Sequence, residues 1–126
     1  MREILFRGKR IDNDEWVYGD LVRIGNKSYI THCVDPDTVG QYTGMTDKND
    51  KKIFEGDILE ISTNEYREIE LVEYDTEENS GYAFSYKAGM LLGDWDRHYI
   101  NVIGNIHDNP ELLKSRSQER RSSYSV

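Results

Sequence analysis

Short runs of apolar and aromatic residues, broken every few positions by Gly, Asn or Asp, recur along most of the chain. Apolar side chains alternate between two faces within several of these runs, most clearly in residues 82–86. Alternation over about four to eight residues is typical of half-buried β-strands. The pattern predicts a mainly β protein whose strands cover residues 4–10, 16–24, 27–34, 41–45, 52–53, 57–62, 66–75, 82–86 and 99–106.

Turn-forming residues separate the predicted strands. Gly, Pro, Asn and Asp favour turns because they tolerate or preset backbone angles that strands do not use. Such residues occupy positions 12–14, 25–26 and 35–37, and the segment 77–81 contains Asn79 and Gly81. The polar segment 46–51 lies between two apolar runs and is therefore predicted to be the tip of a β-hairpin.

A Gly-Asp pair stands between apolar pairs at two places, Gly19-Asp20 and Gly56-Asp57. Glycine inside a strand pattern marks a bulge, a corner or a close backbone approach, and the following Asp can accept hydrogen bonds from backbone N–H groups. Strands of a small barrel need such corners to bend and close the sheet. These four residues are expected to be structural corners. The predicted fold is a small SH3-like or related closed or pseudo-barrel of about 6–8 short strands.

Helical patterns are scarce. Residues 110–121 are predicted to form a short C-terminal helix, because Asn109 is a good N-cap and Pro110 suits the first helical position. Apolar residues run out after Leu113, so residues 114–126 are predicted to be a frayed or disordered polar tail. The chain is thus divided into a folded domain, 1–113, and this tail.

Composition narrows the classes of protein to consider. A chain of 126 residues is long enough for one domain with a single core. Its net charge of -8 argues against generic nucleic-acid or membrane-surface binding, which needs a basic surface. No apolar stretch approaches the roughly 18 residues of a spanning helix, and the start of the sequence lacks the apolar run of a signal peptide. A cytoplasmic protein without a membrane partner is therefore expected, and the single cysteine, Cys33, fits that compartment.

The charge is unevenly placed along the chain. Four basic residues against one acidic residue give residues 1–10 a net charge of +3. Eight acidic residues against Arg67 give residues 60–78 a net charge of -7. Charge runs of this kind are typical of solvated strand faces, and the alternative is an acidic surface presented to a basic partner.

Six short blocks, in order, carry a resemblance to a known family. They are Phe6-Arg7-Gly8-Lys9, Trp16-Val17-Tyr18-Gly19, Thr38-Val39-Gly40-Gln41-Tyr42-Thr43-Gly44, Asp47-Lys48-Asn49, Ile53-Phe54-Glu55-Gly56-Asp57-Ile58 and Ile103-Gly104-Asn105-Ile106. Through them residues 1–113 resemble the YopX family of bacteriophage and prophage proteins. The family pattern has Asn-Gly at the hairpin tip, where this chain has Asn49-Asp50 and so lacks the residue best suited to positive φ.

The resemblance implies a compact β-barrel-like domain that is encoded by a phage or prophage and acts in the cytoplasm of the bacterial host. It implies no particular activity, and it supplies no catalytic residues to carry over to this chain. A function must therefore be predicted from the residues themselves.

Candidate catalytic and metal-binding groups are few. Asp47, Asp50, Glu55 and Asp57 lie close together in sequence and could supply metal ligands or an acid–base pair. Their spacing matches no calcium loop, and lysines stand between them, so a solvated hairpin tip with a corner carboxylate is the expected interpretation. Three scattered histidines and one cysteine do not make a zinc pattern. No catalytic residue, metal or cofactor is predicted, and a metal-dependent enzyme is the less favoured alternative.

Basic residues beside aromatic rings suggest a nucleic-acid-binding barrel as another alternative. Exposed rings can stack on bases while cations contact phosphates. Arg7, Lys9 and Arg10 are the candidate basic contacts for such binding. The acidic segment 60–78 would repel a nucleic-acid backbone, and a further alternative makes it an acidic DNA mimic.

The leading hypothesis is a non-enzymatic protein-interaction module that binds a host or phage protein. Polar residues on a turn-rich segment of a rigid scaffold suit recognition. The expected contact surfaces are segment 40–52 and the acidic strand face 65–78. The expected contact residues are Gln41, Tyr42, Asp47, Lys48 and Asn49. Alternatively these residues only stabilise turns, and an edge strand could also pair with a second copy to form a homo-oligomer.

Overall fold

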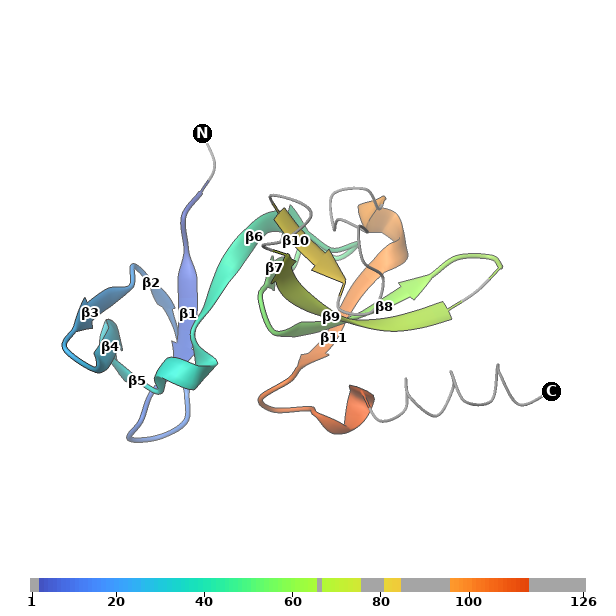
Figure 1. Cartoon of the computed structure of the whole chain (residues 1–126). Coiled ribbons are helices and arrows are strands. Elements are labelled where there is room, and N and C mark those ends of the chain that lie inside the picture. Colours follow the sequence, from blue (N-terminus) through green and yellow to red (C-terminus); the bar gives the residue numbers. More distant parts are fainter. Residues whose placement is uncertain (1–2, 66, 76–80, 85–95, 114–126) are drawn as a thin grey trace.

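The computed structural model describes residues 3–65, 67–75, 81–84 and 96–113. Within them the chain forms eleven β-strands and two short 3₁₀ helices (Figure 1). The strands are β1 (Phe6–Lys9), β2 (Trp16–Gly19), β3 (Val22–Ile24), β4 (Lys27–Ile30), β5 (His32–Val34), β6 (Gly40–Thr46), β7 (Lys52–Phe54), β8 (Asp57–Ser62), β9 (Arg67–Asp75), β10 (Gly81–Phe84) and β11 (Ile100–Asn105). The 3₁₀ helices are η1 (Pro36–Thr38) and η3 (Arg97–Tyr99).

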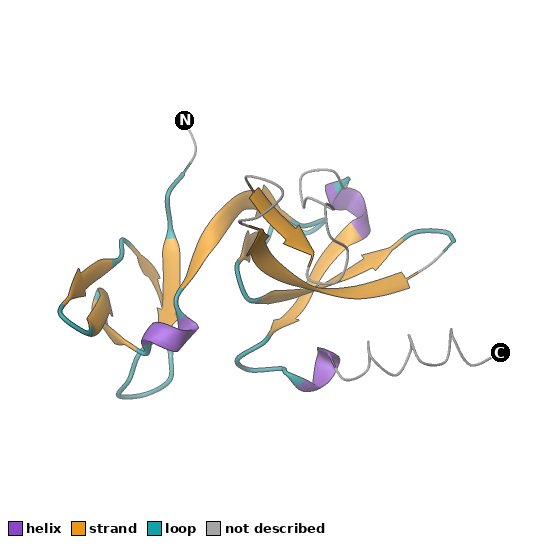
Figure 2. Ribbon diagram, in the orientation of Figure 1, coloured by secondary structure: helices purple, strands orange, loops and turns teal. Residues whose placement is uncertain are grey.

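The strands form three sheets in which every pairing is antiparallel. Their orders are β2-β1-β6-β7, β10-β9-β8-β11 and β3-β4-β5. The predicted mainly β class is confirmed, as is a short helical turn near the C-terminus, at residues 111–113 (Figure 2). The described strands are shorter and more numerous than expected. Their sheet orders are linear, so the pairing seen among them is that of open sheets that pack together.

Two of the predicted strands are divided in the structure. The range 16–24 becomes β2 and β3, and the range 27–34 becomes β4 and β5. The second break falls at Thr31, whose φ of 62° lies in the left-handed region that β-branched residues rarely adopt. Across this turn Ile30 pairs directly with His32. The apolar alternation did not reveal the break because both flanking segments remain extended.

The predicted hairpin tip at residues 46–51 is confirmed by the pairing of β6 with β7. Asp47, only 1% exposed, organises it: its Oδ1 accepts hydrogen bonds from the N–H groups of Asn49 (2.8 Å) and Lys51 (2.9 Å). Asp50, which stands where the family pattern has Gly, has a φ of 64°. The tip therefore keeps the positive φ that glycine would favour, with an aspartate in its place.

The pair Gly56-Asp57 makes the tight turn between β7 and β8. Gly56 has a φ of 89°, and Asp57 Oδ2 accepts a hydrogen bond from the Phe54 N–H at 2.8 Å. This is the corner geometry expected of a Gly-Asp pair. In the other pair, Gly19 is the last residue of β2 and Asp20 is exposed in the link to β3, so two pairs that look alike in sequence have different surroundings.

Two clusters of the hydrophobic core lie on the two faces of the β8–β9–β11 part of the second sheet. One cluster contains Ile53, Leu59, Ile61, Val72 and Ile100. The other contains Ile58, Ile69 and Leu71, with Leu112 and Leu113 of the C-terminal helical turn packed against it. Successive side chains of a strand point to opposite faces, so β8 supplies residues to both clusters. The predicted helix beyond residue 113 and the predicted tail lie outside the described residues.

Figure 1 shows β1–β5 gathered on one side of the molecule and β7–β11 on the other, with β6 running between them. Within the first group, β1 packs on the inner face of the third sheet. A Cβ placed at Gly8 would lie 3.1 Å from Val34 Cγ2 and 3.3 Å from Ile30 Cδ1, and both of these partners are fully buried. The glycine therefore allows β1 to approach the third sheet closely.

Candidate functional site

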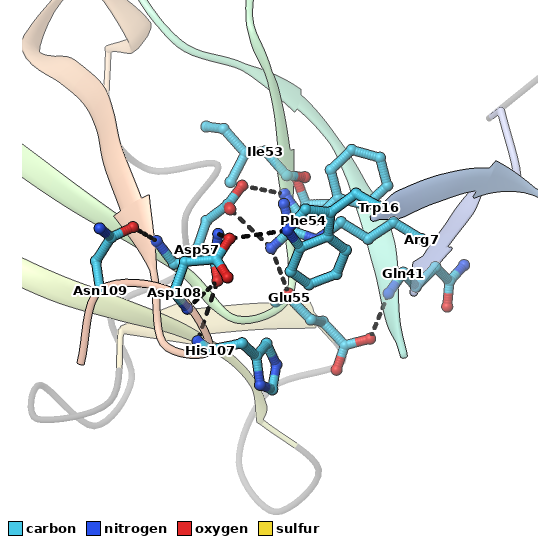
Figure 3. A network of polar contacts seen from close by, with 12 residues as sticks. Arg7, Trp16, Gln41, Ile53, Phe54, Glu55, Asp57, His107, Asp108 and Asn109 are labelled. Carbon is cyan, nitrogen blue, oxygen red and sulfur yellow. Dashed lines mark hydrogen bonds and ion pairs between the residues drawn. The ribbon is translucent and has the colours of Figure 1, made fainter. Parts of the chain in front are cut away.

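A buried ion pair joins the two groups of strands. Arg7 on β1 and Asp57 at the start of β8 are 5% and 1% exposed, and Arg7 Nη2 lies 2.8 Å from Asp57 Oδ1 (Figure 3). The same Nη2 donates to the backbone carbonyl of Glu55 at 3.2 Å. Removing two charges from water is costly unless their other polar atoms are also satisfied, so the surroundings decide how stable the pair is.

Two aromatic rings enclose the Arg7 guanidinium. Its Cζ lies 4.7 Å from the centroid of the Trp16 ring and 4.9 Å from that of the Phe54 ring. Contacts of this kind between a cation and ring faces are attractive, more so when water is excluded. Arg7 Nε is buried and has no hydrogen-bond partner among the described residues. Part of the donor capacity of Arg7 is therefore unused.

The Asp57 carboxyl is strongly desolvated. Burial raises its pKa above the ordinary value, and the Arg7 charge and the Phe54 N–H oppose that shift. Both carboxylate oxygens of Asp57 are engaged, one by Arg7 and one by Phe54. This arrangement holds β1 against β8 and does not expose a reactive acid.

A second polar cluster lies beside the ion pair. Asp108 Oδ2 accepts a hydrogen bond from Trp16 Nε1 at 2.8 Å, and Asp108 Oδ1 pairs with the Lys9 ammonium. The hydrogen bonds from Lys9 and Trp16 lower the pKa of Asp108 to about 2. The His107 ring lies 5.9 Å from the Trp16 ring, and its pKa is lowered by burial and by the charges of Arg7 and Lys9.

The loop after β11 presents His107 and Asp108 to β1 and β2. Asn105 Oδ1 accepts hydrogen bonds from the N–H groups of His107 (3.0 Å) and Asp108 (2.9 Å). Asn109 Oδ1 in turn accepts one from the Asn105 N–H at 3.3 Å. A Cβ at Gly104 would lie 2.6 Å from Asn109 Oδ1, so this position must remain glycine for the loop to fold back.

Four of the six blocks that carry the family resemblance meet at this junction. They contribute Arg7, Trp16, Asp57 and Asn105, which are far apart in sequence. Their polar groups are engaged mainly with one another and with backbone atoms. The arrangement is therefore suited to fixing two groups of strands relative to each other.

The predicted contact residues of segment 40–52 lie in different surroundings. Tyr42 is 6% exposed and packs on the Phe54 ring, with ring centroids 5.6 Å apart. Gln41 is half-buried, and its N–H donates to Glu55 Oε1 at 3.0 Å. Asp47 is buried and accepts a further hydrogen bond from the Val102 N–H at 3.0 Å.

The two remaining predicted contact residues, Lys48 and Asn49, are exposed on the hairpin tip. The Lys48 N–H donates to the Ile100 carbonyl at 2.9 Å, which ties the tip to β11. Asn49 Nδ2 donates to Asn101 Oδ1 at 3.3 Å. The tip is thus attached to the second sheet, with two polar side chains on its surface.

The basic residues proposed for nucleic-acid contact are all paired with carboxylates. Arg7 pairs with Asp57, and Lys9 pairs with Asp108. Arg10 pairs with Asp12 at 2.6 Å, on the surface. These three side chains therefore do not form a row of uncompensated positive charges.

The acidic segment also differs from a uniformly solvated face. Glu70 is fully buried, and Glu60 accepts a hydrogen bond from Arg67 Nε at 2.8 Å. Glu65 and Glu73 are exposed. Residues 76–78 lie outside the described residues.

Sequence reasoning missed two surface features. One is β3, at the edge of the third sheet, where Val22 and Ile24 are 51% and 64% exposed. The other is a hollow of about 360 Å³ beside Arg7, lined also by Tyr18 and Phe54. The alternation in residues 16–24 indicated a strand but not which face would be covered, and no local signal marked the hollow.

No group of three or more His, Cys, Asp or Glu side chains that could hold a metal ion is found within the described part of the chain. Of the helices that can be described, none has the length and apolar character needed to cross a membrane. The proximity of Asp47, Asp50, Glu55 and Asp57 in sequence thus does not bring them together as a ligand set.

The fold and the junction define a small, mainly β domain of three packed sheets. A family model described as YopX protein matches residues 2–114, and the chain belongs to the YopX family. The crystal structure of protein EF1440 from Enterococcus faecalis is similar in fold, with a TM-score of 0.56 and 23% sequence identity. That similarity covers 90% of this chain and 99% of the other. No curated protein gives a significant match.

Proposed function

We propose that this chain is a non-enzymatic interaction module of a phage or prophage that binds a host or phage protein in the bacterial cytoplasm. The observation that carries the proposal is the edge strand β3. All three of its residues are exposed, and two of them, Val22 and Ile24, are large and apolar. Apolar side chains on an exposed edge strand are a liability unless a partner covers them.

The geometry of β3 suits the addition of a further strand. β3 is hydrogen-bonded to β4 on one side and is the outer strand of its sheet. Figure 1 places it at the side of the molecule farthest from β8, β9 and β11. An extended partner segment can pair with the backbone of such an edge, while alternate side chains supply specificity.

The scaffold beneath β3 is well packed. Ser28 and Ile30 of β4 and Val34 of β5 are buried on the inner face of the same sheet, where Ile30 and Val34 lie against Gly8 of β1. The face that carries Val22 and Ile24 is therefore presented by a sheet whose other face is already covered. A preformed surface of this kind loses little conformational entropy on binding.

The test compares two isoleucines of equal exposure. Tagged wild-type protein, Ile24→Lys and Ile4→Lys are used to capture partners from lysate of the bacterial host, with and without nuclease, and the captured proteins are identified by mass spectrometry. Ile24 is 64% exposed on β3 and Ile4 is 65% exposed outside it, so Ile4→Lys is the matched control.

We expect one dominant captured protein whose recovery does not depend on nuclease. Ile4→Lys should still capture it, and Ile24→Lys should not. Partners that disappear with nuclease would instead support nucleic-acid binding, whose affinity should also fall steeply with salt. Equal capture by both variants would reject β3 as the contact surface.

A further inference from the structure

The hollow beside Arg7 lies where β1, β2 and β7 meet, and none of its lining residues belongs to β3. Its volume is about 360 Å³. The lining residues that matter here are Arg7, Tyr18, Lys51, Lys52 and Phe54. Sites for small molecules are concave, range from about 300 to 1,000 Å³, and combine apolar walls with a few polar groups.

Three of the lining side chains are cationic. Arg7 is buried, whereas Lys51 and Lys52 are exposed. Within the described residues Lys51 has no salt bridge, although its charge acts on Asp47 and Asp57. Lys52 lies 3.9 Å from Glu3, both of them well exposed, and 5.5 Å from the centroid of the Tyr42 ring. Exposed pairs of this kind are weak. Because Asp57 compensates the Arg7 charge, Lys51 and Lys52 are the two cations that the hollow offers to an anion, on a protein whose net charge is -8.

Aromatic rings form another part of the wall. Tyr18 is 52% exposed and meets Phe54 edge-on, with ring centroids 5.6 Å apart. Phe54 is itself held against the Arg7 guanidinium. An exposed ring that is fixed in this way offers a stacking surface for a planar ligand.

Arg7 provides an independent indication of a ligand. It is 5% exposed, it lines the hollow, and its Nε has no hydrogen-bond partner among the described residues. Buried polar atoms are nearly always satisfied, so an unsatisfied donor calls for an explanation. An acceptor atom of a ligand that reaches Arg7 Nε from the hollow would supply the missing partner.

We propose that this hollow binds a small ligand in which a planar ring is joined to an anionic group, either a phosphate monoester or a carboxylate. The ring stacks on Tyr18, and the anionic group lies between Lys51, Lys52 and Arg7.

A small ligand fits the charge distribution better than a polyanion does. The net charge of -8 repels a long nucleic-acid backbone, whereas a ligand with one or two charges responds mainly to nearby cations. Screening limits the reach of exposed charges to about 8 Å at physiological ionic strength. Glu3 at the rim acts as a weak competitor for Lys52, so an incoming anion replaces a contact that already exists.

The experiment titrates ¹⁵N-labelled protein with four probes followed by NMR. Phenyl phosphate and benzoate each contain a ring and an anionic group, inorganic phosphate has the charge alone, and phenol has the ring alone. Phenyl phosphate or benzoate should shift the amide signals of Tyr18, Lys51 and Lys52. It should bind at least about tenfold more tightly than inorganic phosphate or phenol, since both halves of the hollow contribute. Comparison of the two ring-containing anions shows which anionic group is preferred.

Variants locate the site. The double substitution Lys51→Ala/Lys52→Ala should weaken binding of the preferred probe by at least about tenfold. Lys48→Ala removes an exposed lysine of the same hairpin tip outside the hollow and should leave the affinity unchanged. Glu3→Gln should strengthen binding, because it removes the competing carboxylate. Tyr18→Phe should keep the affinity and Tyr18→Leu should lower it.

The proposal is overturned if neither ring-containing anion binds at millimolar concentration. It is also overturned if inorganic phosphate binds as tightly as phenyl phosphate and benzoate, or if Lys48→Ala weakens binding as much as the double substitution. Far-UV circular dichroism of each variant identifies any that fails to fold. If a Tyr18 variant does not fold, the variants of the exposed lysines still test the proposal.

Discussion

Arg7 Nη2 and Asp57 Oδ1 lie 2.8 Å apart in the interior of the protein, and this contact joins the first strand of the chain to β8. The pair is covered by the Trp16 and Phe54 rings and lies beside the Asp108 cluster. The relative position of the two groups of strands thus depends on contacts between charged and aromatic side chains as well as on β6.

Removing one partner of this pair should be strongly destabilising. Asp57→Ala leaves the buried Arg7 charge uncompensated, and the free energy of unfolding measured with urea should fall by about 3–5 kcal/mol. The double variant Arg7→Met/Asp57→Leu should be more stable than Asp57→Ala, since no buried charge remains. Arg10→Ala, which removes an exposed ion pair with Asp12, is the control and should change little. A loss in the control as large as that in Asp57→Ala would contradict this view of the pair.

Asp47 should act as the anchor of the hairpin tip. Its buried carboxylate accepts three backbone hydrogen bonds, from Asn49, Lys51 and Val102. Asp47→Ala leaves these donors without their acceptor, and the free energy of unfolding should fall by about 2–3 kcal/mol. Hydrogen exchange should accelerate most at those three amides. Asn49→Ala, at an exposed position of the same tip, should leave the exchange of the Val102 amide unchanged.

Thr31 carries backbone strain that glycine would relieve. Its φ of 62° is unfavourable for a β-branched residue, and its side chain is exposed. Thr31→Gly should therefore raise the free energy of unfolding by about 1 kcal/mol, after allowing for the greater freedom of glycine in the unfolded chain. Thr31→Val keeps the strain and should show no such gain. Thermal unfolding of both variants tests this, and a gain in Thr31→Val alone would refute it.

Asp108 should contribute to loss of stability in acid. Its pKa in the folded protein is about 2, below the ordinary value of 3.8. Its contribution is therefore fully present above pH 3.8 and is lost as the pH falls from 3.8 towards 2, because the unfolded chain binds the proton first. Asp108→Asn should lower stability at neutral pH and flatten the stability curve in that window. Urea titrations at several pH values measure this, and an unchanged slope below pH 3.8 would speak against it.

Local features of the chain were readable from the sequence because they depend on neighbouring residues. The alternation of apolar positions predicted most strands, and the polar stretch 46–51 predicted a hairpin tip. The Gly56-Asp57 corner follows from the freedom of glycine and from the carboxylate that accepts the Phe54 N–H. The divided strands were missed because a single residue with positive φ, Thr31, leaves the apolar pattern intact.

The candidate sites depended on contacts between residues far apart in the chain, which cannot be predicted from the sequence of one segment. Asp47 looked like a surface residue of a polar tip, yet folding against β11 buries it. Arg7 looked like a free cation of a basic N-terminal segment, yet it is enclosed by two rings and paired with Asp57. Ile24 belonged to a single predicted strand over 16–24, yet it lies exposed on the separate edge strand β3.

Strand class, turn positions and family membership were therefore accessible from the residues alone, because each is encoded in short segments and in their order along the chain. The packing of the three sheets decided which polar side chains are buried and which apolar ones remain exposed. It also decided where a hollow forms. The burial of a side chain and the pairing of its charge depend on contacts with residues that are distant in sequence. The sequence of a strand specifies which residues share a face, but not which of the two faces another sheet will cover.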